Sequence, residues 1–347
     1  MREGTSVSSD ESPPPMAHSG NRKPPSTIYD VARATGVSPS TVSRALNKPG
    51  RINVKTEQRI RAAAAELNYR LNPMARALPT GRTGTLGLIL TDITNPVYFS
   101  LVRGAEQVTA ALGYTLVLAE SQESPELELE TAQRLLVSVD GLVLVASRLD
   151  DAAIVDLADQ KPLVVVNRRV DGVDAVIPNV APGIREALDH LNELGHQSLA
   201  YLSGPTASWM SRLRWETLLE QAVDRGMSIV EIGPGAPTLD GGRDALLRVR
   251  AAGVTAVIAY NDLMAIGLLL SANQSGLTVP DDLSIVGFDD IFGSDFTSPP
   301  LTTIRTPLGA VGDRAMRGLI ASLDSADLTT PFELETELVV RGSTSAR

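Results

Sequence analysis

The sequence has no cysteine, only 3 histidines among its 347 residues and an aromatic content of 4%. Without cysteine the chain can form no disulfide and carry out no thiolate chemistry, which fits a reducing compartment. No apolar run reaches the roughly 18 residues of a membrane-spanning helix, and no apolar stretch near the N-terminus resembles a signal peptide. We therefore expect a cytoplasmic protein.

Motifs of the common enzyme classes are also missing. The sequence contains neither a P-loop nor an HExxH motif. The segment GPGAP at 233–237 follows a predicted strand, but prolines interrupt it and no third glycine completes a dinucleotide-binding turn. No plausible nucleophile lies near any of the histidines, which are His18, His190 and His196. We predict no catalytic residue, no metal and no cofactor, and a structural role for the last two histidines.

Positive and negative charges are distributed unevenly along the chain. Between Arg22 and Arg82 there are 12 Lys and Arg against 3 acidic residues, a net charge of +9. The residues before Arg22 carry −2 and the whole chain carries −10, so the residues after Arg82 carry −17. This pattern is typical of a nucleic-acid-binding module joined to an anionic body that does not itself bind DNA.

Residues 27–47, inside the cationic segment, have the pattern of two short helices joined by a tight turn. Thr27 can cap the first helix, and Gly36 can adopt the positive φ that the turn needs. Ser38 can cap the second helix, whose first residue is Pro39. Its outward side chains are those that hydrogen-bond phosphates and base edges, namely Ser40, Thr41, Ser43, Arg44 and Asn47. We interpret this stretch as a helix-turn-helix; the alternative is an ordinary helical hairpin within a larger fold.

A third helix and a hinge are predicted next. The third helix runs over about residues 54–67 and is capped by Asn53. The segment 73–79, with proline at both ends, allows a helix of about one and a half turns, which is too short to persist alone in water. We predict that it folds on DNA, with Arg76 at a phosphate and Leu78 as an apolar wedge in the minor groove. The alternative is a plain interdomain linker.

From Thr85 onward, short runs rich in Val, Ile and Leu alternate with segments of helical length. Runs such as TLGLIL and LVVV are continuously apolar, which is typical of parallel strands buried on both faces. There are about twice as many strand–helix units as one sheet comfortably holds, so we predict two similar α/β subdomains. A helix after Pro307 and closing strands near residues 332–341 follow the second set.

Several stretches match one known family, in this order: IYDVARATGVSPSTVSRALN, AAAAELNYRLNPMARAL, TGTLGLILTDITNPVYFSLVRGAE, AYNDLMAIGLL, DDLSIVGFDD and SPPLTTIRTP. On these motifs the sequence from Thr27 to Arg341 resembles the lactose-repressor family of bacterial transcription regulators. The resemblance implies a three-helix headpiece, a hinge helix, and a core of two doubly wound subdomains like those of type I periplasmic binding proteins, with a ligand cleft between them. It also implies a homodimer.

The resemblance implies the following division of the chain: a disordered extension (1–25), a helix-turn-helix headpiece (26–71), a hinge helix and linker (72–83), an N-subdomain (84–178 plus 307–324), a C-subdomain (179–306 plus 325–341) and a tail (342–347).

By position, the resemblance assigns base reading to Pro39, Ser40 and Arg44, of which the guanidinium can pair with guanine O6 and N7. It assigns phosphate contacts, which set register, to Thr27, Tyr29, Thr41, Ser43 and Asn47. It matches Leu78 to a leucine wedged into the central base step. Two such leucines in a dimer would bend a near-palindromic operator.

Ligands of parallel sheets bind beyond the carboxyl ends of the strands. There the sequence places groups suited to a polyhydroxylated ligand: Asp92, Asn95, Tyr98, Phe99, Arg148, Asn167, Trp209, Arg214, Asn261 and Asp289, with Ser147 and Met210 beside them. We expect the largest contributions from Asp92, Arg214, Asn261 and Asp289. Two alternatives are open, because Asn95 and Asn261 could be helix N-caps and the pair Asp289-Asp290 could cap a loop.

Three features depart from the family pattern. Asn167 stands where many members carry Asp, so one charged contact to a sugar is in doubt. The segment GPGAPTLDGG lacks an aromatic residue that some members place there, so stacking would fall to Trp209 or Tyr98. No heptad-bearing tail follows Arg341, which argues against a coiled-coil tetramer.

These features predict a DNA-binding transcriptional regulator, by default a repressor that occludes its operator, whose affinity for DNA a small effector controls. The resemblance favours a sugar or sugar derivative, with purines and nucleosides next, while Arg148 and Arg214 could serve a phosphate. Effectors that release DNA and effectors that promote binding are both compatible with the sequence. The alternatives are a soluble carbohydrate-binding protein, in which the headpiece has no use, and a doubly wound α/β enzyme, whose motifs are missing.

Overall fold

The computed structural model describes residues 26–47, 50–69, 81–324 and 334–347. The predicted extension 1–25 and the predicted hinge helix, with Arg76 and Leu78, lie outside these residues. The chain divides into two compact units, Met1–Pro79 and Thr80–Arg347, termed here the headpiece and the core.

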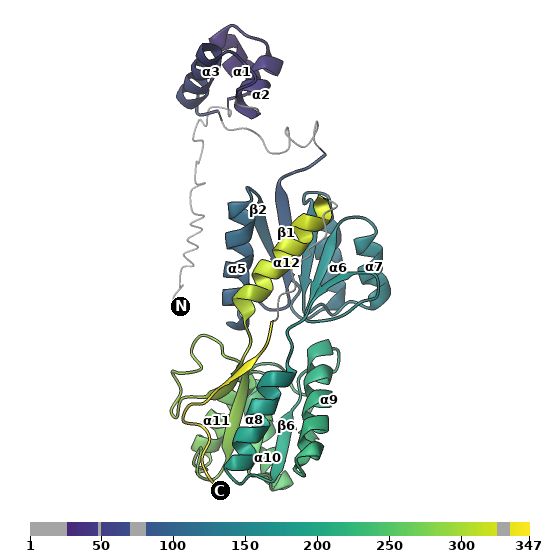
Figure 1. The fold of residues 1–347 in the computed structure, drawn as a ribbon, viewed down its shortest axis with the longest axis vertical. Helices are drawn as coiled ribbons and strands as arrows, with labels where there is room; N and C mark the ends of the chain where they lie inside the picture. The colour runs from purple at the N-terminus through teal and green to yellow at the C-terminus, as the bar shows by residue number, and fades with distance from the viewer. Residues whose placement is uncertain (1–25, 48–49, 70–80, 325–333) are drawn as a thin grey trace, which may run out of the picture. The chain divides into compact units, whose positions relative to one another are not determined.

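The described part of the headpiece consists of three short helices, α1 (Ile28–Thr35), α2 (Pro39–Asn47) and α3 (Val54–Glu66) (Figure 1). Their common core is small and is formed by Val31, Ala32, Val42, Ala45, Ile60 and Ala64, with Tyr69 packed against it. The apolar residues of each helix recur three or four positions apart, so one face of each helix is buried. The predicted helix-turn-helix is confirmed.

Hydrogen bonds at the helix ends involve the predicted capping residues. The Asp30 carboxylate accepts from the backbone N–H of Thr27 at 2.8 Å and from its hydroxyl at 2.7 Å. Gly36 ends α1 with a φ of 67°, and Oγ of Ser38 accepts from the N–H of Thr41 at 3.2 Å. Since helix ends leave backbone groups unpaired, these residues determine where the two helices begin and end.

The first sheet of the core consists of five parallel strands in the order β2-β1-β3-β4-β5. Along the chain these are β1 (Thr85–Leu90), β2 (Thr115–Glu120), β3 (Gly141–Val145), β4 (Leu163–Val166) and β5 (Asp174–Val176). Helices α5 (Val97–Ala111) and α12 (Leu308–Leu323) cover one face. Helices α6 (Pro125–Leu136) and α7 (Asp151–Ala158) cover the other. Burial on both faces explains why β1, β3 and β4 read as unbroken apolar runs.

The second sheet has the order β11-β10-β9-β8-β6-β7. Its strands are β6 (Ser198–Leu202), β7 (Ser228–Ile232), β8 (Ala256–Ala259), β9 (Ser284–Asp289), β10 (Thr302–Arg305) and β11 (Glu337–Val339), and β11 pairs antiparallel. Helices α8 (Ala181–Glu193) and α9 (Trp209–Asp224) cover one face. Helices α10 (Leu239–Ala252) and α11 (Asp262–Gln274) cover the other. The predicted pair of α/β subdomains is therefore confirmed.

Strand β10 was not among the predicted strands. Its Arg305 is exposed and its other three residues are buried, although two of those three are threonines. Their polar groups are paired, because the N–H of Thr302 donates to Oγ of Ser343 at 2.8 Å and Oγ1 of Thr303 donates to Asp262 at 2.6 Å. A search for apolar runs overlooks such a strand, since its polar groups are satisfied by partners distant in sequence.

The core chain crosses between the two sheets more than once. It passes from β5 in the first sheet to α8 on the second, returns from β10 to α12, and crosses again before β11 (Figure 1). Helices α5 and α12 pack closely, since a Cβ on Gly104 would lie 2.0 Å from the carbonyl oxygen of Gly309. Among the described residues, no helix is long and apolar enough to span a bilayer.

Candidate functional site

Helix α2 of the headpiece presents polar side chains to solvent. Ser40 and Arg44 are exposed, and half-buried beside them are Pro39, Thr41 and Ser43. Oγ of Ser38 lies 2.9 Å from the hydroxyl of Ser40 and equally far from that of Thr41. Arg44 forms no hydrogen bond or ion pair with any described residue, so its guanidinium is available to a ligand. Asn47 ends the helix, and its side chain lies outside the described set.

Helix α1 adds an aromatic ring to the same unit. Tyr29 is 66% exposed, and Thr27 before it is exposed as well. The exposed basic residues of the headpiece include Arg33, Arg51, Lys55 and Arg59. A small cationic unit with outward hydroxyls and a guanidinium unpaired among the described residues has the chemistry to bind phosphates and base edges.

A cavity with an empty volume of about 660 Å³ lies in the core, between residues of the two subdomains. It is located at the carboxyl ends of the strands, with Ala146 after β3, Asn167 after β4, Tyr260 and Asn261 after β8, and Asp289 at the end of β9. This is where ligands of doubly wound sheets bind. Seven predicted residues line it: Asn95, Tyr98, Arg148, Asn167, Arg214, Asn261 and Asp289.

Three predicted residues do not line the cavity. Oδ1 of Asp92 accepts from the N–H and the hydroxyl of Thr94, at 2.8 and 2.6 Å, and so stabilises a turn. Phe99 lies on the outer side of α5 and is 51% exposed. Trp209 packs against the apolar cluster beneath α8 and α9. Each of them follows a strand end as predicted, but the direction of its side chain depends on local turns and packing.

Met210, which the sequence placed beside the candidates, also lines the cavity. None of the other lining residues was predicted; three of them are polar (Glu123, Tyr260 and Thr306) and the rest are apolar (Val97, Leu101, Ala146, Pro178, Val180, Pro237 and Leu308). Glu123 follows the carboxyl end of β2, so the rule that identified the other candidates could have found it. Thr306 follows β10, a strand that the sequence did not reveal. Tyr260 immediately precedes a predicted residue and was read as the end of a strand.

The first ion pair of the cavity joins Arg214 to Asp289. Nη2 of Arg214 donates to Oδ1 of Asp289 at 2.8 Å, and the two side chains are only 6% and 9% exposed. The guanidinium lies 3.6 Å from the centroid of the Phe288 ring and also donates to the carbonyl of Tyr260. Burial alone would lower the pKa of Arg214, but the charge and hydrogen bond of Asp289 together with the neighbouring Tyr260 and Tyr201 outweigh burial, and the pKa is raised. This arginine therefore stays ionised.

The second ion pair joins Arg148 to Glu123. Nε of Arg148 donates to Oε2 of Glu123 at 2.7 Å, and the arginine side chain is 6% exposed. Nη1 donates to the carbonyl of Ala146 at 2.8 Å, and the backbone N–H donates to Glu128 at 2.8 Å. The buried arginine is thus held by partners from three segments of the first subdomain.

Asn95 and Asn261 line the cavity and also bond to backbone groups at the start of a helix. Oδ1 of Asn261 accepts from the N–H of Met264 at 2.9 Å, and its amide donates to the carbonyl of Pro237 at 3.0 Å. Oδ1 of Asn95 accepts from the N–H of Val97 at 3.1 Å. The capping interpretation is therefore confirmed for Asn261, and Asn95 stabilises the start of α5. Both still border the cavity.

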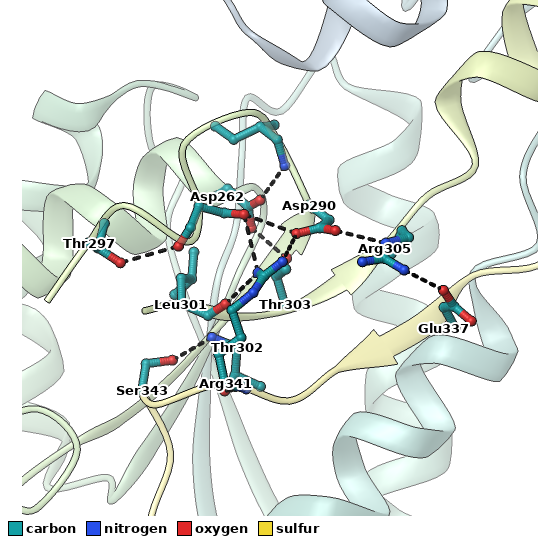
Figure 2. A network of polar contacts seen from close by, with 12 residues as sticks. Asp262, Asp290, Thr297, Leu301, Thr302, Thr303, Arg305, Glu337, Arg341 and Ser343 are labelled. Atoms are coloured by element: carbon teal, nitrogen blue, oxygen red, sulfur yellow. Dashed lines mark hydrogen bonds and ion pairs between the residues drawn. The ribbon is translucent and has the colours of Figure 1, made fainter. Parts of the chain in front are cut away.

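Asp289 and Asp290 are adjacent in sequence, but their carboxylates bind different partners. Asp289 borders the cavity, and its Oδ1 also accepts from Oγ1 of Thr306 at 3.3 Å. Asp290 accepts from Nε of Arg305 at 2.7 Å and from Nη2 of Arg341 at 2.6 Å (Figure 2). Residues 305 and 306 begin the crossing from β10 to α12, so the two aspartates together hold one of the connections between the subdomains.

A third aspartate, Asp262, lies behind this connection. It is fully buried at the start of α11 and accepts from the hydroxyl of Thr303 at 2.6 Å and from the N–H of Ile291 at 2.8 Å (Figure 2). Burial raises its pKa to about 8. It does not line the cavity, and we assign it a structural role.

The remaining titratable groups fit a structural interpretation. Nδ1 of His196 lies 2.8 Å from Oγ1 of Thr255, and Nε2 of His190 lies 2.9 Å from Oγ1 of Thr344. Both rings tie secondary-structure ends together, as predicted. Within the described ranges, no group of three or more His, Asp or Glu is arranged to hold a metal ion.

Comparison with known proteins places this geometry in a family. Residues 27–72 match a model described as bacterial regulatory proteins, lacI family, and residues 188–344 match a periplasmic binding protein-like domain. A ribose operon repressor of Halalkalibacterium halodurans is 33% identical over 92% of this chain and 97% of its own length. The transcriptional repressor CytR of Escherichia coli K12 is 32% identical, over 92% and 96%.

Solved structures give the same result. A lac repressor dimer bound to operator and the anti-inducer ONPF superposes with a TM-score of 0.84, at 28% identity, over 93% of this chain and all of that one. A lacI-family regulator from Enterococcus faecium with bound ribose has a TM-score of 0.65, at 26% identity, over 75% of this chain and 98% of that one.

Proposed function

This chain belongs to the lacI family of bacterial regulatory proteins, and we propose that a small hydroxylated ligand in the core cavity sets its affinity for a near-palindromic operator. It is a DNA-binding transcriptional regulator that acts as a homodimer, and it is not an enzyme. Relatives such as the ribose operon repressor and CytR are named repressors, and we propose that this chain too represses by occluding its operator. We place it in the cytoplasm, where such a regulator meets DNA.

On the DNA side, we assign base reading to α2. Arg44 is exposed and unpaired among the described residues, so it can offer two N–H groups to one guanine. Ser40 and Pro39 stand beside it, and phosphate contacts fall to Thr27, Tyr29, Thr41, Ser43 and Asn47. For the segment outside the described residues we retain Arg76 as a phosphate contact and Leu78 as the wedge.

On the effector side, the observation that carries the proposal is the double attachment of Asp289. One carboxylate borders the cavity, pairs with Arg214 at 2.8 Å and accepts from Thr306 at 3.3 Å, on the connection between the subdomains. A ligand that bonds to Asp289 would alter its hold on Thr306. The ligand could then favour one angle between the subdomains, which is a shift between two populated states.

The ligand contacts proposed for the cavity are Asn95, Tyr98, Arg148, Asn167, Arg214, Asn261 and Asp289. The cavity combines amides, carboxylates and guanidinium groups with apolar walls, as a sugar or nucleoside requires. Similar proteins fit this class: one relative is named a ribose operon repressor, and one solved relative holds ribose.

Operator selection from random duplex DNA, followed by titration with the full chain, tests the proposal. We expect a two-fold symmetric site and an affinity that changes when a sugar or nucleoside from a metabolite panel is added. The test variant is Arg44→Ala in the headpiece, and its matched control is Arg103→Ala on the exposed side of α5. Failure to enrich any sequence, or equal losses in the two variants, would overturn the proposal.

A further inference from the structure

The cavity contains four ionised side chains, and they are paired one to one. Arg148 pairs with Glu123 at 2.7 Å within the first subdomain, and Arg214 pairs with Asp289 at 2.8 Å within the second. The other polar side chains of the lining are neutral amides and hydroxyls. The lining therefore carries no net charge in either half.

Both arginines have already used donors that a phosphate would need. Arg148 donates through Nε to Glu123 and through Nη1 to the carbonyl of Ala146. Arg214 donates through both terminal nitrogens, to Tyr260 and Asp289. Because both guanidinium groups are almost fully buried, they cannot turn toward a new anion without breaking these bonds.

A phosphoryl group brings a charge of about −1.5 to −2 at neutral pH. In this cavity it would approach two carboxylates: Asp289, 9% exposed, where water screens charge poorly, and Glu123, 33% exposed, where screening is stronger. The two positive charges that could offset it are already matched. Entry of a phosphate ester is therefore opposed by both subdomains.

Unused hydrogen-bonding capacity favours a different ligand. No described residue donates to Oε1 of Glu123 or to Oδ2 of Asp289, so each can accept a bond from a hydroxyl. Nε of Arg214 is buried without a hydrogen-bond partner in the described structure and can donate to a hydroxyl oxygen. Neighbouring hydroxyls on a sugar ring can serve both a carboxylate and a guanidinium.

We propose that the effector is an uncharged polyhydroxylated molecule and that Glu123 is a specificity-determining residue, which excludes phosphorylated compounds by occupying Arg148. This inference rests on the proposed role of the cavity as the effector site. It replaces the alternative that Arg148 and Arg214 serve a phosphate. Glu123 thereby contributes both an acceptor for ligand hydroxyls and the charge that neutralises the nearest arginine.

The experiment measures thermal unfolding of the full chain in inorganic phosphate and in chloride of equal ionic strength. The two tryptophans, Trp209 and Trp215, both lie in the core, so their fluorescence reports core unfolding alone. Wild type should show only the general rise in melting temperature that phosphate, a salt excluded from protein surfaces, gives any folded protein. Glu123→Gln should gain a phosphate-specific rise of roughly 2 °C or more, because it frees the Arg148 charge. Adding Arg148→Gln should remove that gain.

The control is Glu106→Gln, which removes the same charge from an exposed site on α5 and should gain nothing. A rise in wild type as large as that in Glu123→Gln, or no gain in Glu123→Gln beyond that of wild type, overturns the proposal. Glu123→Ala serves as a second variant if the amide is not tolerated. Operator binding, measured on the same samples, is independent: its absence would refute the proposed function and leave the phosphate result to be judged separately.

Discussion

The headpiece and the core place their candidate functional side chains in opposite environments. In the headpiece the candidate contacts point outward, as Tyr29 and Arg44 do, and Arg44 is left unpaired by its described neighbours. In the core the corresponding groups are buried and already bonded to each other, as Arg214 and Asp289 are. A surface that meets a large polyanion needs free charges. A cavity that encloses a small molecule must neutralise its own charges while it is empty.

The same contrast separates two ion pairs of similar chemistry. Arg33 and Asp30 on α1 are 3.6 Å apart, with side chains 81% and 38% exposed. Arg214 and Asp289 are 2.8 Å apart, at 6% and 9%. Water screens the first pair, so little stability depends on it. The second pair cannot lose one member without leaving a buried charge.

The largest effect is therefore expected from Asp289→Ala. Removing the carboxylate leaves the Arg214 guanidinium buried without its counter-ion, which should lower the free energy of unfolding of the core by about 3–5 kcal/mol. The effector response should also disappear, while operator affinity at low temperature persists. Tryptophan fluorescence in urea gives the first quantity and operator titration the others. The control is Asp295→Ala, an exposed aspartate in the segment that follows β9. Equal losses of stability in the two variants would count against the difference between the two units.

The second, smaller effect is on the pH dependence of stability. One buried aspartate should make the core less stable as pH rises, and one hydrogen-bonded aspartate should make the headpiece less stable as pH falls. Asp262 in the core has a folded pKa of about 8, raised by burial, so the folded state holds a proton that the unfolded chain releases near pH 4. Core stability should thus decline as pH rises toward 8, by at most about 1.4 kcal/mol per pH unit. In the headpiece, hydrogen bonds from Thr27 lower the pKa of Asp30. Stability from that group is present above pH 4 and is lost as pH falls below it.

Between pH 6.5 and 8 the Asp262 contribution should dominate. Burial lowers the pKa values of His190 and His196, so those groups lower stability mainly as pH falls below about 6.5. Above that pH their remaining effect raises stability with pH, which is opposite in sign to the effect of Asp262. Urea unfolding at both ends of the window should show a less stable core at pH 8, and Asp262→Asn should remove the difference. The exposed Asp281→Asn is the control. A wild-type core that is equally stable at both pH values would refute the protonated state of Asp262.

Third, Arg44→Ala should cost about 1–3 kcal/mol of operator affinity and relax the preference at one base pair. The melting temperature of the core should not change, because the residue belongs to the other unit. Selection of operators by the variant, compared with wild type, measures both quantities. An unchanged base preference would remove Arg44 from the base-reading set.

The smallest effect compares equivalent caps in the two units. Oδ1 of Asn53 accepts from the N–H of Lys55 at 3.0 Å at the start of α3, and Oγ1 of Thr238 accepts from the N–H of Gly241 at 3.2 Å at the start of α10. Each alanine substitution should cost about 1 kcal/mol. Asn53→Ala should speed amide exchange in the headpiece only, and Thr238→Ala in the core only. Exchange that changes in both units at once would show that they unfold together.

Local and long-range contacts differ in how well the sequence predicts them. The helix-turn-helix depends on neighbours a few residues apart, such as Ser38 and Gly36, so spacing alone located it. Most strands were found because burial on both faces makes them continuously apolar. Strand β10 was missed because Thr302 and Thr303 are satisfied by Ser343 and Asp262, which spacing cannot pair with them.

The cavity was predictable only in part, for a related reason. The rule that ligands bind at strand ends found seven lining residues, among them Arg214 and Asp289. It could not decide whether a side chain at such an end turns inward: Asp92 turns to Thr94 and Phe99 to solvent, while Glu123 turns toward Arg148. The direction of each depends on partners distant in sequence. The pairing of the cavity charges, on which the proposed exclusion of phosphorylated ligands rests, became visible only from the fold.

The most direct measurement is the affinity of the full chain for its selected operator as a function of salt concentration. A cationic headpiece that neutralises several phosphates predicts a steep linear fall of log K against log salt, shallower for Arg44→Ala if that guanidinium meets DNA. Binding that does not depend on salt, or no preference for a two-fold symmetric site, would contradict the division of roles between a DNA-binding headpiece and a ligand-binding core.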